Sequence, residues 1–451
     1  MSIDPVQMRE RAASLAARAV ELSDAESTEA VAAVSASSLT RFAENRIHQN
    51  VAEENAEVSV RAVVGKRTGV ASTNRLDDES LRACCRAAAA AAKSAPEDPG
   101  FPGLPSGGAS AAAPDRTAPA TVAFGAEERA GAVRAIVDQS ASRGLVCAGG
   151  IQSSVRAYAV ANSLGVSAAQ ASSDVRVTVL SMGHEGGSGW ASLMTRDASE
   201  IAAAAIGDEA ATLAERSERP GNLDPGSYTV VLAPEAVADL LDFMCWLGLS
   251  AKSVEEGRSF VSGRLGQKVM SDRITIVDDA LAEHAFGTVF DFEGVPRQRV
   301  TLIENGVAVG VVTDSYWAAR TGTENTGHAL PAPNPHGPLP LNVEMAAGDA
   351  TIDELIASVE RGVYVTRFHY VNVENPVPVT LTGMTRDGTF MIENGRLTKP
   401  LKNLRFTQSV IEALGDVRGV TSERVWVGAE FSPSLVPGLL LGSFAFTGQT
   451  S

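Results

Sequence analysis

Helical and strand patterns alternate along the first half of the chain. Apolar residues recur at helical spacing over residues 4–22, 77–93, 127–142 and 197–216. Between these segments, apolar and polar residues alternate with the two-residue period of half-exposed strands. The pattern therefore predicts helices packed on an antiparallel sheet. The expected strands cover residues 30–38, 38–51 and 57–64, with at least three more within 145–182, and the expected turns lie at 44–45, 65–66 and 162–165.

Strand patterns dominate the second half, around one helix. Two prolines and two glycines within residues 220–226 interrupt regular structure, which places a domain border at residue 222. A strand at 228–233 leads into a helix over 234–249, where proline suits the first turn. Further strands are expected at 273–279, 299–314, 361–373, 378–403 and 439–448, with hairpin tips at Asn305-Gly306, Asp387-Gly388 and Asn394-Gly395.

These elements predict an α+β fold with two domains. Residues 1–222 form an N-terminal helix-and-antiparallel-sheet domain, and residues 223–451 form a β-rich C-terminal domain with one prominent helix. Residues 94–121 interrupt the first domain, because six of the 21 prolines fall there beside several glycines and serines. We expect this segment to be a mobile surface excursion rather than part of the core; its role, as a lid or a decoration, is left open.

Composition excludes several classes of function. With 38 Lys+Arg against 54 Asp+Glu, the net charge of −16 repels phosphate backbones, so we expect no direct nucleic-acid partner. The longest apolar runs, at 230–233 and 436–441, fall far short of the roughly 20 residues that cross a bilayer. The N-terminal stretch is amphipathic and charged, unlike a signal peptide. We therefore expect a soluble, cytoplasmic protein without a membrane partner.

The cysteines show no framework or metal-binding pattern. Cys84 and Cys85 are adjacent in an Ala-rich helical run, Cys147 lies in an expected strand and Cys245 lies among aromatic residues. No CxxC spacing is present, and no histidine lies at ligand spacing from any of them. We interpret all four as reduced thiols that act as small buried hydrophobes.

One histidine begins a known catalytic pattern but does not complete it. His184-Glu185 resembles the start of HExxH, yet Ser188 stands where the second histidine is required. Glycines on both sides favour a turn over the helix that this motif needs. We interpret the segment as a glycine-rich turn.

The other five histidines do not form a site by spacing either. His328 and His336 flank a proline-rich loop, where exposure is expected, whereas His48 and His369 lie in expected strands and His284 follows an acidic stretch. The chain contains no GxSxG elbow that would nominate a serine nucleophile. The residues alone therefore indicate no active site.

Several sequence blocks, taken together, resemble the TldD/PmbA family, in which PmbA is also called TldE. Their order and spacing span nearly the whole chain. The blocks are RFAENRIHQNVAEENAEVSVRAVVGKRTG at 41–69, YAVANSLGV at 158–166, FEGVPRQRVTLIENGVAVGVVTD at 292–314, DELIASVERGVYVTRF at 353–368 and FMIENGRLTKPLKNLRF at 390–406.

The resemblance implies a two-domain α+β fold and a dimer that encloses a central chamber. In TldD-type members a helix carries HExxxH, whose two histidines bind zinc beside a glutamate that acts as general base, and a downstream cysteine completes the metal site. The implied reaction is hydrolysis of a peptide bond. TldD-type and TldE-type subunits resemble each other and assemble as a protease for unfolded or extended peptides.

This chain departs from the TldD-type motif at each metal ligand. Pro234 replaces the first histidine, Glu235 keeps the glutamate and Asp239 replaces the second histidine. The C-terminal block WVGAEFSPSLVPG at 426–438 has no cysteine, and Cys245 is the last one in the chain. We therefore expect no metal, no cofactor and no catalytic residue in this chain. Glu235 is interpreted as a first-turn carboxylate that stabilises the helix dipole rather than as a base.

The sequence thus predicts a TldE-type subunit without metal, whose partner is a TldD-type subunit that supplies zinc, and whose ligand is an extended peptide. Two alternatives stay open. One is a self-sufficient homodimeric peptidase with a relocated site near His328 and His336. The other is a non-enzymatic regulator that acts through protein contacts. A homodimer is compatible with the main prediction as well, because symmetric pairing is the commonest assembly.

Overall fold

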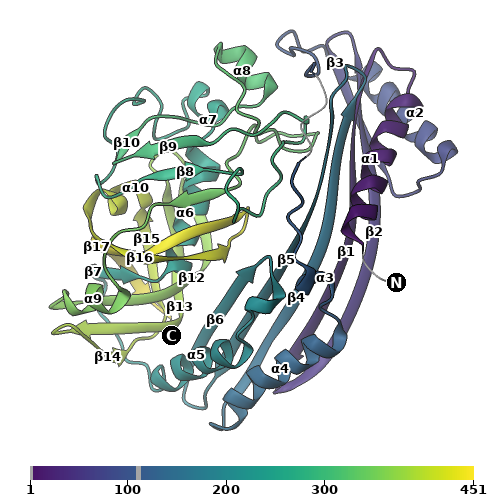
Figure 1. Ribbon diagram of the computed structural model, residues 1–451. Coiled ribbons are helices and arrows are strands. Elements are labelled where there is room, and N and C mark those ends of the chain that lie inside the picture. Colours follow the sequence, from purple (N-terminus) through teal and green to yellow (C-terminus); the bar gives the residue numbers. More distant parts are fainter. Residues whose placement is uncertain (1–3, 108–112, 451) are drawn as a thin grey trace.

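The computed structural model describes residues 4–107 and 113–450. It contains two β-sheets, one from each half of the chain, and both carry helices (Figure 1). The predicted α+β class is therefore confirmed. The long strands of the first sheet run beside the C-terminal body, and one face of that sheet is turned toward it (Figure 1).

The first sheet is antiparallel, with strand order β3-β2-β1-β4-β5-β6. Most residues at alternate positions on one face of β1 and β4 are apolar and pack with the helices, as the period of a strand allows. The bounds are β1 (Ser27–Ala43), β2 (Arg46–Val64), β3 (Arg67–Thr73), β4 (Val146–Asn162), β5 (Ser167–Met182) and β6 (Ser188–Thr195), and the helices are α1 (Pro5–Glu21), α2 (Asp78–Ser94), α3 (Pro119–Val122), α4 (Ala126–Ala141), η1 (Ala198–Glu200) and α5 (Ala203–Arg216).

The predicted helices and turns of this half are largely confirmed, but its strands are longer than expected. The break expected at Ser38 is absent, and β2 continues through residues 52–57, whose side chains are almost all exposed. Because both faces of that stretch meet water, no alternation marks it as a strand. Residues 146–182 likewise form two strands instead of at least three, and the last helix begins at Ala203 rather than 197.

The second sheet is mixed and partly closed. Strand β7 pairs in parallel with β12 and antiparallel with β17, which closes β17, β15, β13, β12 and β7 into a ring. The bounds are β7 (Gly226–Leu232), β8 (Ile276–Asp278), β9 (Val300–Glu304), β10 (Val307–Ala308), β11 (Val343–Met345), β12 (Arg361–Asn375), β13 (Thr380–Glu393), β14 (Arg396–Pro400), β15 (Leu404–Ser409), β16 (Val417–Gly428) and β17 (Pro433–Gln449).

The predicted prominent helix is α6 (Pro234–Gly248), which is buried in the largest apolar cluster of the protein. It packs on β12 and β17, so the N-terminal turn of α6 is fixed by strands that are distant in sequence. The shorter helices of this half are α7 (Ala251–Glu255), α8 (Ser315–Thr321), α9 (Ile352–Ala357), α10 (Val410–Ala413) and η2 (Leu414–Asp416).

One of the three predicted hairpin tips is wrong. Asn305-Gly306 and Asn394-Gly395 do form turns between strands. Asp387 and Gly388 instead lie inside β13, where the register against β12 shifts. Both residues have positive φ, at 54° and 126°, so they form a β-bulge that leaves the strand continuous. A bulge and a hairpin favour the same residue types, and the sequence alone does not separate them.

The proline-rich segment is more firmly held than the sequence suggested. Its predicted lack of long regular elements is confirmed for the described residues, although α3 begins within it at Pro119. Phe101 and Leu104, however, are buried against Val63, and Arg116 is buried between the two halves of the chain. The expectation of a surface excursion is therefore wrong for these positions. Residues 108–112, the centre of the segment, lie outside the described residues.

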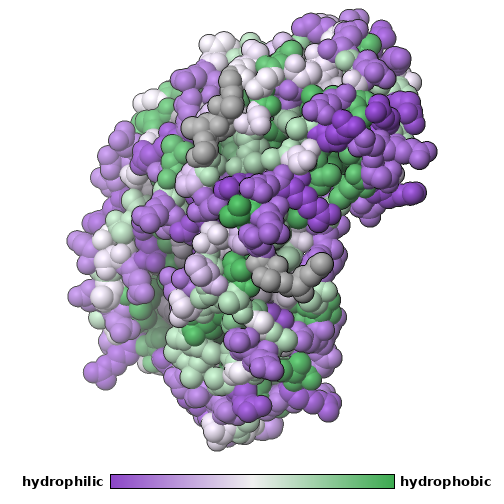
Figure 2. Space-filling model, turned by 45° about the vertical axis from the view of Figure 1, so that its right-hand side comes forward, coloured by the Kyte–Doolittle hydropathy of each residue, from purple (hydrophilic) through white to green (hydrophobic). Residues whose placement is uncertain are grey.

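The two sheets are separated in sequence by residues 217–225, between α5 and β7. The domain border at residue 222 falls in this interval and stays a prediction. Within the described part of the chain, no helix combines the length and the apolar character needed to cross a membrane. Hydrophilic and hydrophobic side chains are intermixed over the face shown in Figure 2.

Candidate functional site

The strand-helix junction at β7 and α6 is the position at which the resemblance places the metal motif. Ala233 links the two elements, and its amide donates to the Val365 carbonyl at 2.9 Å. Pro234 occupies the first helical turn, where its missing N–H costs no intrahelical bond. Glu235, Asp239 and Asp242 follow at spacings of four and three residues, which places their carboxyl groups on one face of α6.

Asp239 is bound to the backbone of β12. Its carboxylate accepts a hydrogen bond from the Phe368 amide at 3.3 Å. Burial raises the pKa of Asp239 to about 7, and the charges of Asp242 and Glu235 add to this effect, while the Phe368 amide and Arg367 oppose it. The side chain is therefore close to half protonated near neutral pH.

Glu235 is partly buried in the first turn of the same helix. Burial raises the pKa of its carboxyl to about 7, and its own backbone amide opposes that rise. The predicted place of Glu235 in the first turn is confirmed. The dipole interpretation assumes a fully ionised carboxylate, whereas burial favours the neutral form. The role assigned to Glu235 stays a prediction.

Arg367, the nearest cation on β12, is already engaged by other groups. Its Nε donates to the Asp387 carboxylate at 2.9 Å, and its guanidinium lies over the Trp190 ring with 4.0 Å to the ring centroid. Ser188 donates to the other oxygen of Asp387 at 2.7 Å. The bulge in β13 thus joins β6 of the first sheet to β12 of the second.

Asp242 connects α6 to the C-terminal block at residues 429–432. Its carboxylate accepts from the Phe431 amide at 2.9 Å. Burial raises the pKa of Asp242 to about 6, although amides of Phe431, Ser432 and Glu430 oppose this. The Phe431 ring packs on Trp246 of the same helix, with 4.7 Å between ring centroids. The two segments to which the resemblance assigns the metal ligands therefore lie together in this fold.

The residues present at these positions do not fit a zinc ion. Pro234 has no donor atom, and the Asp239 carboxylate is held by a backbone amide. Cys245 is buried, and burial raises the pKa of its thiol far from the range in which a thiolate forms readily. Across residues 4–107 and 113–450, no group of three His, Cys, Asp or Glu side chains could hold a metal ion.

Among the described residues, no histidine side chain is hydrogen-bonded to Glu235, Asp239 or Asp242. His184 is in the loop between β5 and β6, as predicted, and its Nε2 lies 2.9 Å from the Gly144 carbonyl. His328 corrects an expectation: it is completely buried, with its ring nitrogens hydrogen-bonded to Thr326 and Asp278. His336 is exposed as predicted and lies against Trp246, 6.4 Å between centroids.

His48, His369 and the four cysteines lie in the elements predicted from the sequence. His48 lies in β2 and His369 in β12, while His284 contacts Glu344 with 2.7 Å between Nε2 and the carboxylate. The interpretation of the four cysteines as buried free thiols is confirmed for Cys84, Cys85, Cys147 and Cys245.

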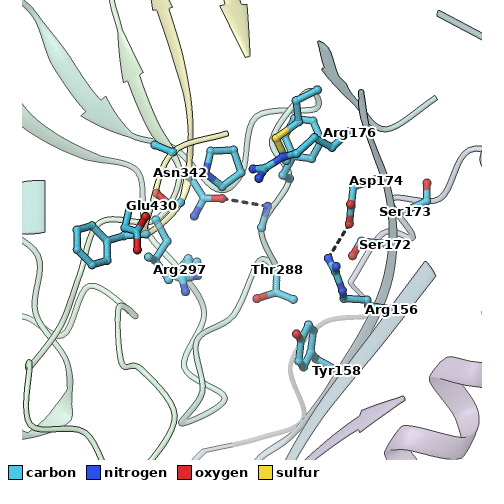
Figure 3. A pocket seen from close by; sticks show the side chains of 18 of the residues that line it. Arg156, Tyr158, Ser172, Ser173, Asp174, Arg176, Thr288, Arg297, Asn342 and Glu430 are labelled. Atoms are coloured by element: carbon cyan, nitrogen blue, oxygen red, sulfur yellow. Dashed lines mark hydrogen bonds and ion pairs between the residues drawn. The ribbon is translucent and has the colours of Figure 1, made fainter. Parts of the chain in front are cut away.

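A pocket of about 460 Å³ lies between the two halves of the chain, beside residues 429–432 (Figure 3). One wall is the face of β4 and β5 that is turned away from the helices of the first sheet, and it presents Arg156, Tyr158, Asp174 and Arg176. The other wall comes from the C-terminal half, and its residues include Phe286, Thr288, Arg297, Asn342 and Glu430.

Sequence reasoning missed this pocket. Its only sequence signal is the run of polar side chains at alternate positions of β4 and β5, opposite the apolar face of those strands. Such alternation normally marks a face in water. Only the tertiary structure reveals that a second domain covers it.

Three domain models describe the chain at the family level. The PmbA/TldA metallopeptidase domain 1 matches residues 28–92, the central domain matches 120–218 and the C-terminal domain matches 225–448. This chain belongs to the PmbA/TldD family. The curated relatives of this PmbA/TldD chain include a metalloprotease of Methanothermobacter thermautotrophicus, 27% identical over 55% of this chain and 54% of the relative. A metalloprotease TldD homolog of Haemophilus influenzae is 31% identical over 44% of this chain and 41% of that protein.

The matched region thus spans about half the length of these relatives or less. Solved structures of similar fold cover nearly the whole chain. TldE from Thermococcus kodakarensis has a TM-score of 0.85 at 20% identity, over 96% of this chain and 99% of that one. A putative modulator of a DNA gyrase from Thermotoga maritima has a TM-score of 0.81 at 18% identity, over 98% and 100%. At these identities the likeness shows the fold of this PmbA/TldD member.

Proposed function

We propose that this chain is a TldE/PmbA-type subunit without metal in a TldD/TldE-type metalloprotease that hydrolyses unfolded or extended peptides. One observation carries the proposal. The α6 face that bears the zinc motif in TldD-type members holds Pro234, which has no donor, and Asp239, whose carboxylate is bound by the Phe368 amide. The partner supplies zinc, and this chain supplies part of the chamber and of the peptide-binding surface.

The retained architecture supports a binding role rather than a vestigial one. Asp242 still fastens residues 429–432 to α6, so the walls around the lost metal site keep a defined shape. The interdomain pocket opens beside these residues. A peptide strand would add its backbone hydrogen bonds at an unpaired strand edge of the C-terminal sheet, as in other cases of strand addition.

The test combines metal analysis with reconstitution. The purified chain alone should contain far less than one zinc per chain and should not cleave an unstructured peptide. Cleavage should appear after addition of a TldD-type partner with an intact HExxxH motif, and a partner with its motif glutamate replaced by Gln should restore none. Stoichiometric zinc together with cleavage by the lone chain would overturn the proposal.

The alternative of a relocated site near His328 and His336 has less support. His328 is completely buried and its two ring nitrogens are both hydrogen-bonded, whereas His336 lies on the surface beside Trp246. Replacement of both histidines should therefore leave partner-dependent cleavage intact. A regulatory role at DNA would require protein contacts, because the net charge of −16 opposes direct binding.

A further inference from the structure

The interdomain pocket contains hydrogen-bond donors that the described protein does not use. Arg297 is 4% exposed, and its Nε and Nη1 have no hydrogen-bond partner among the described residues. Buried polar atoms are almost always paired, because an unpaired donor keeps the full cost of its lost hydration. Arg297 lines the pocket, so its donors are available to a ligand there (Figure 3).

The carboxylates near Arg297 do not use these donors. The Asp278 carboxylate accepts a hydrogen bond from the backbone amide of Asn342 at 2.8 Å, and its other oxygen lies 3.0 Å from Nε2 of His328. Asp291 accepts from the backbone amides of residues 293, 295 and 329. Burial lowers the pKa of Arg297, and the charges of Asp278 and Asp291 oppose that effect. The oxygens of both carboxylates are occupied by other groups.

Asn342 adds a third unused donor to the same wall. Its Oδ1 accepts from the Gly287 amide at 3.1 Å, which fixes the orientation of the side-chain amide. Its Nδ2 has no partner among the described residues, and the residue is 2% exposed. Arg297 and Asn342 together present three donor atoms that have no acceptor among the described residues.

The opposite wall is also cationic. Arg156 is paired with Asp174 at 2.6 Å, whereas Arg176 has no ion pair within the described part of the chain. Glu430 also lines the pocket, but its side chain is exposed. Among the charged side chains that line the pocket, the cations Arg156, Arg176 and Arg297 outnumber the anions Asp174 and Glu430, which favours an anionic ligand.

We propose that this pocket binds a carboxylate of the peptide, either its free C-terminus or an Asp or Glu side chain, through Arg297 and Asn342 with support from Arg176. A planar carboxylate matches the forked donors of a guanidinium. The proposal rests on the proposed function, because a peptide bound in the chamber would reach this pocket beside residues 429–432. It names the chemistry by which the subunit without metal holds substrate.

The first experiment compares peptides that differ in one group. Fluorescein-labelled ten-residue Ala/Ser peptides with a free C-terminal carboxylate or a C-terminal amide are titrated with the purified chain, and binding is followed by anisotropy. A second pair carries the amide and one internal Glu or Gln. We expect the carboxylate of at least one pair to lower the Kd about tenfold or more, the scale of a charge-assisted hydrogen-bond pair. Equal affinities in both pairs, or no binding at all, would overturn the proposal.

Three variants assign the effect to the pocket. Asn342→Asp keeps the acceptor for Gly287 but puts an oxygen where the unused donor stands, and it should abolish the carboxylate preference. Arg297→Lys keeps a positive charge near Asp278 and loses the fork, so the preference should fall about fivefold or more. Arg176→Gln changes the other wall and should weaken the carboxylate preference. Because Arg176 is only half-buried, this variant tests the pocket independently of whether the buried Arg297 and Asn342 variants fold.

The matched control is Arg129→Lys. Arg129 is also buried, at 3% exposed, but it lies in α4 and bonds to Thr40 and the Phe124 carbonyl, away from the pocket. This control should keep the full preference, and folding of all variants is checked by thermal unfolding. A wild-type preference in Asn342→Asp and Arg176→Gln would overturn the assignment.

Failure of this inference and failure of the proposed function give different results. Partner-dependent cleavage that is equally fast for acid and amide peptides rejects the carboxylate pocket and leaves the subunit role intact. A clear carboxylate preference in a chain that carries its own zinc and cleaves alone rejects the subunit role and leaves the pocket intact.

Discussion

The Asp242 carboxylate accepts a hydrogen bond from the Phe431 amide at 2.9 Å, which joins α6 to the segment that leads into β17. These two elements are far apart in sequence, and the resemblance to TldD-type members assigns a metal ligand to each. The hydrogen bond therefore joins the two segments from which the resemblance would draw a metal site. The contact lies at the wall of the pocket, which residues 429–432 line.

Replacement of Asp242 should loosen that wall. Asp242→Ala leaves the amides of residues 430–432 without their acceptor, and we expect a loss of about 1–3 kcal/mol in the free energy of unfolding. Asp242→Asn keeps an oxygen acceptor and should lose less. Urea unfolding measures both. An Ala variant as stable as the wild type would show that the contact contributes nothing.

The pH dependence of stability should report on Asp239. Its pKa is raised to about 7 in the folded protein from an ordinary value of 3.8, so the folded state holds more protons than the unfolded state between about pH 4 and 7. Stability from this group therefore falls as pH rises through that window. Asp239→Asn removes the effect: the variant should match the wild type at pH 4 and exceed it above pH 7, by at most about 4 kcal/mol.

Asp77 provides a control of opposite sign for this experiment. It caps α2, and hydrogen bonds from Ser80 hold the pKa of its carboxyl below the usual range. Its contribution is present above the ordinary pKa and is lost as pH falls. Asp77→Asn should therefore be less stable than the wild type at pH 7 and approach it in acid. Parallel pH profiles for both variants would contradict the assignment to Asp239.

Local patterns predicted the five long helices and most turns because their signals are local. The N-caps Asp4 and Asp77 precede amphipathic runs, and residues 44–45 form a turn as expected. The errors fall where tertiary structure decides. Residues 52–57 pair as part of β2 although both of their faces are exposed, and Asp387 forms a bulge because β12 imposes the register. Strands β6, β11, β15 and β16 and the short helices α7 to α10 were also missed.

The sequence predicted the position of the candidate site but not the contacts of its residues. The family pattern located Pro234, Glu235 and Asp239, and α6 begins where that pattern requires. The pattern did not predict the hydrogen-bond partners of this helix. Phe368 and Phe431 are distant from α6 in sequence, and the pairing of the C-terminal strands brings them to it. The unpaired donors of Arg297 are a property of packing, which no spacing along the chain expresses.

Arg116 should contribute strongly to the joining of the two halves. Its guanidinium donates to the carbonyls of Gly287 at 2.5 Å, Ala280 at 2.6 Å and Ala282 at 3.2 Å. Arg116→Ala leaves these acceptors unpaired, and we expect a loss of about 2 kcal/mol or more in unfolding free energy. Urea titration of the purified chain checks the value.

Arg9→Ala is the matched control for Arg116, because Arg9 contacts the same segment through Asp115 at 2.6 Å. Both side chains of that pair are more than a quarter exposed, so the variant should lose no more than about 1 kcal/mol. Equal losses for Arg9→Ala and Arg116→Ala would show that the segment is held by its surface and not by the buried arginine.

Glu235→Gln should separate a structural glutamate from a catalytic one. Glu235 keeps the position of the motif glutamate in the first turn of α6, but Pro234 beside it supplies no metal ligand. Under the proposed function no metal acidifies water beside this carboxyl, so it has no activated nucleophile to generate. Reconstituted cleavage with a TldD-type partner should therefore stay within about twofold of the wild type, whereas loss of a general base typically costs about 100-fold or more.

The same substitution at the motif glutamate of the partner is the internal control, since it should remove cleavage entirely. Burial raises the pKa of Glu235 to about 7, so Gln replaces a side chain that is already partly neutral at physiological pH and should fold normally. A 100-fold loss with normal assembly would make Glu235 a catalytic residue, and the division of labour between the two subunits would then be wrong.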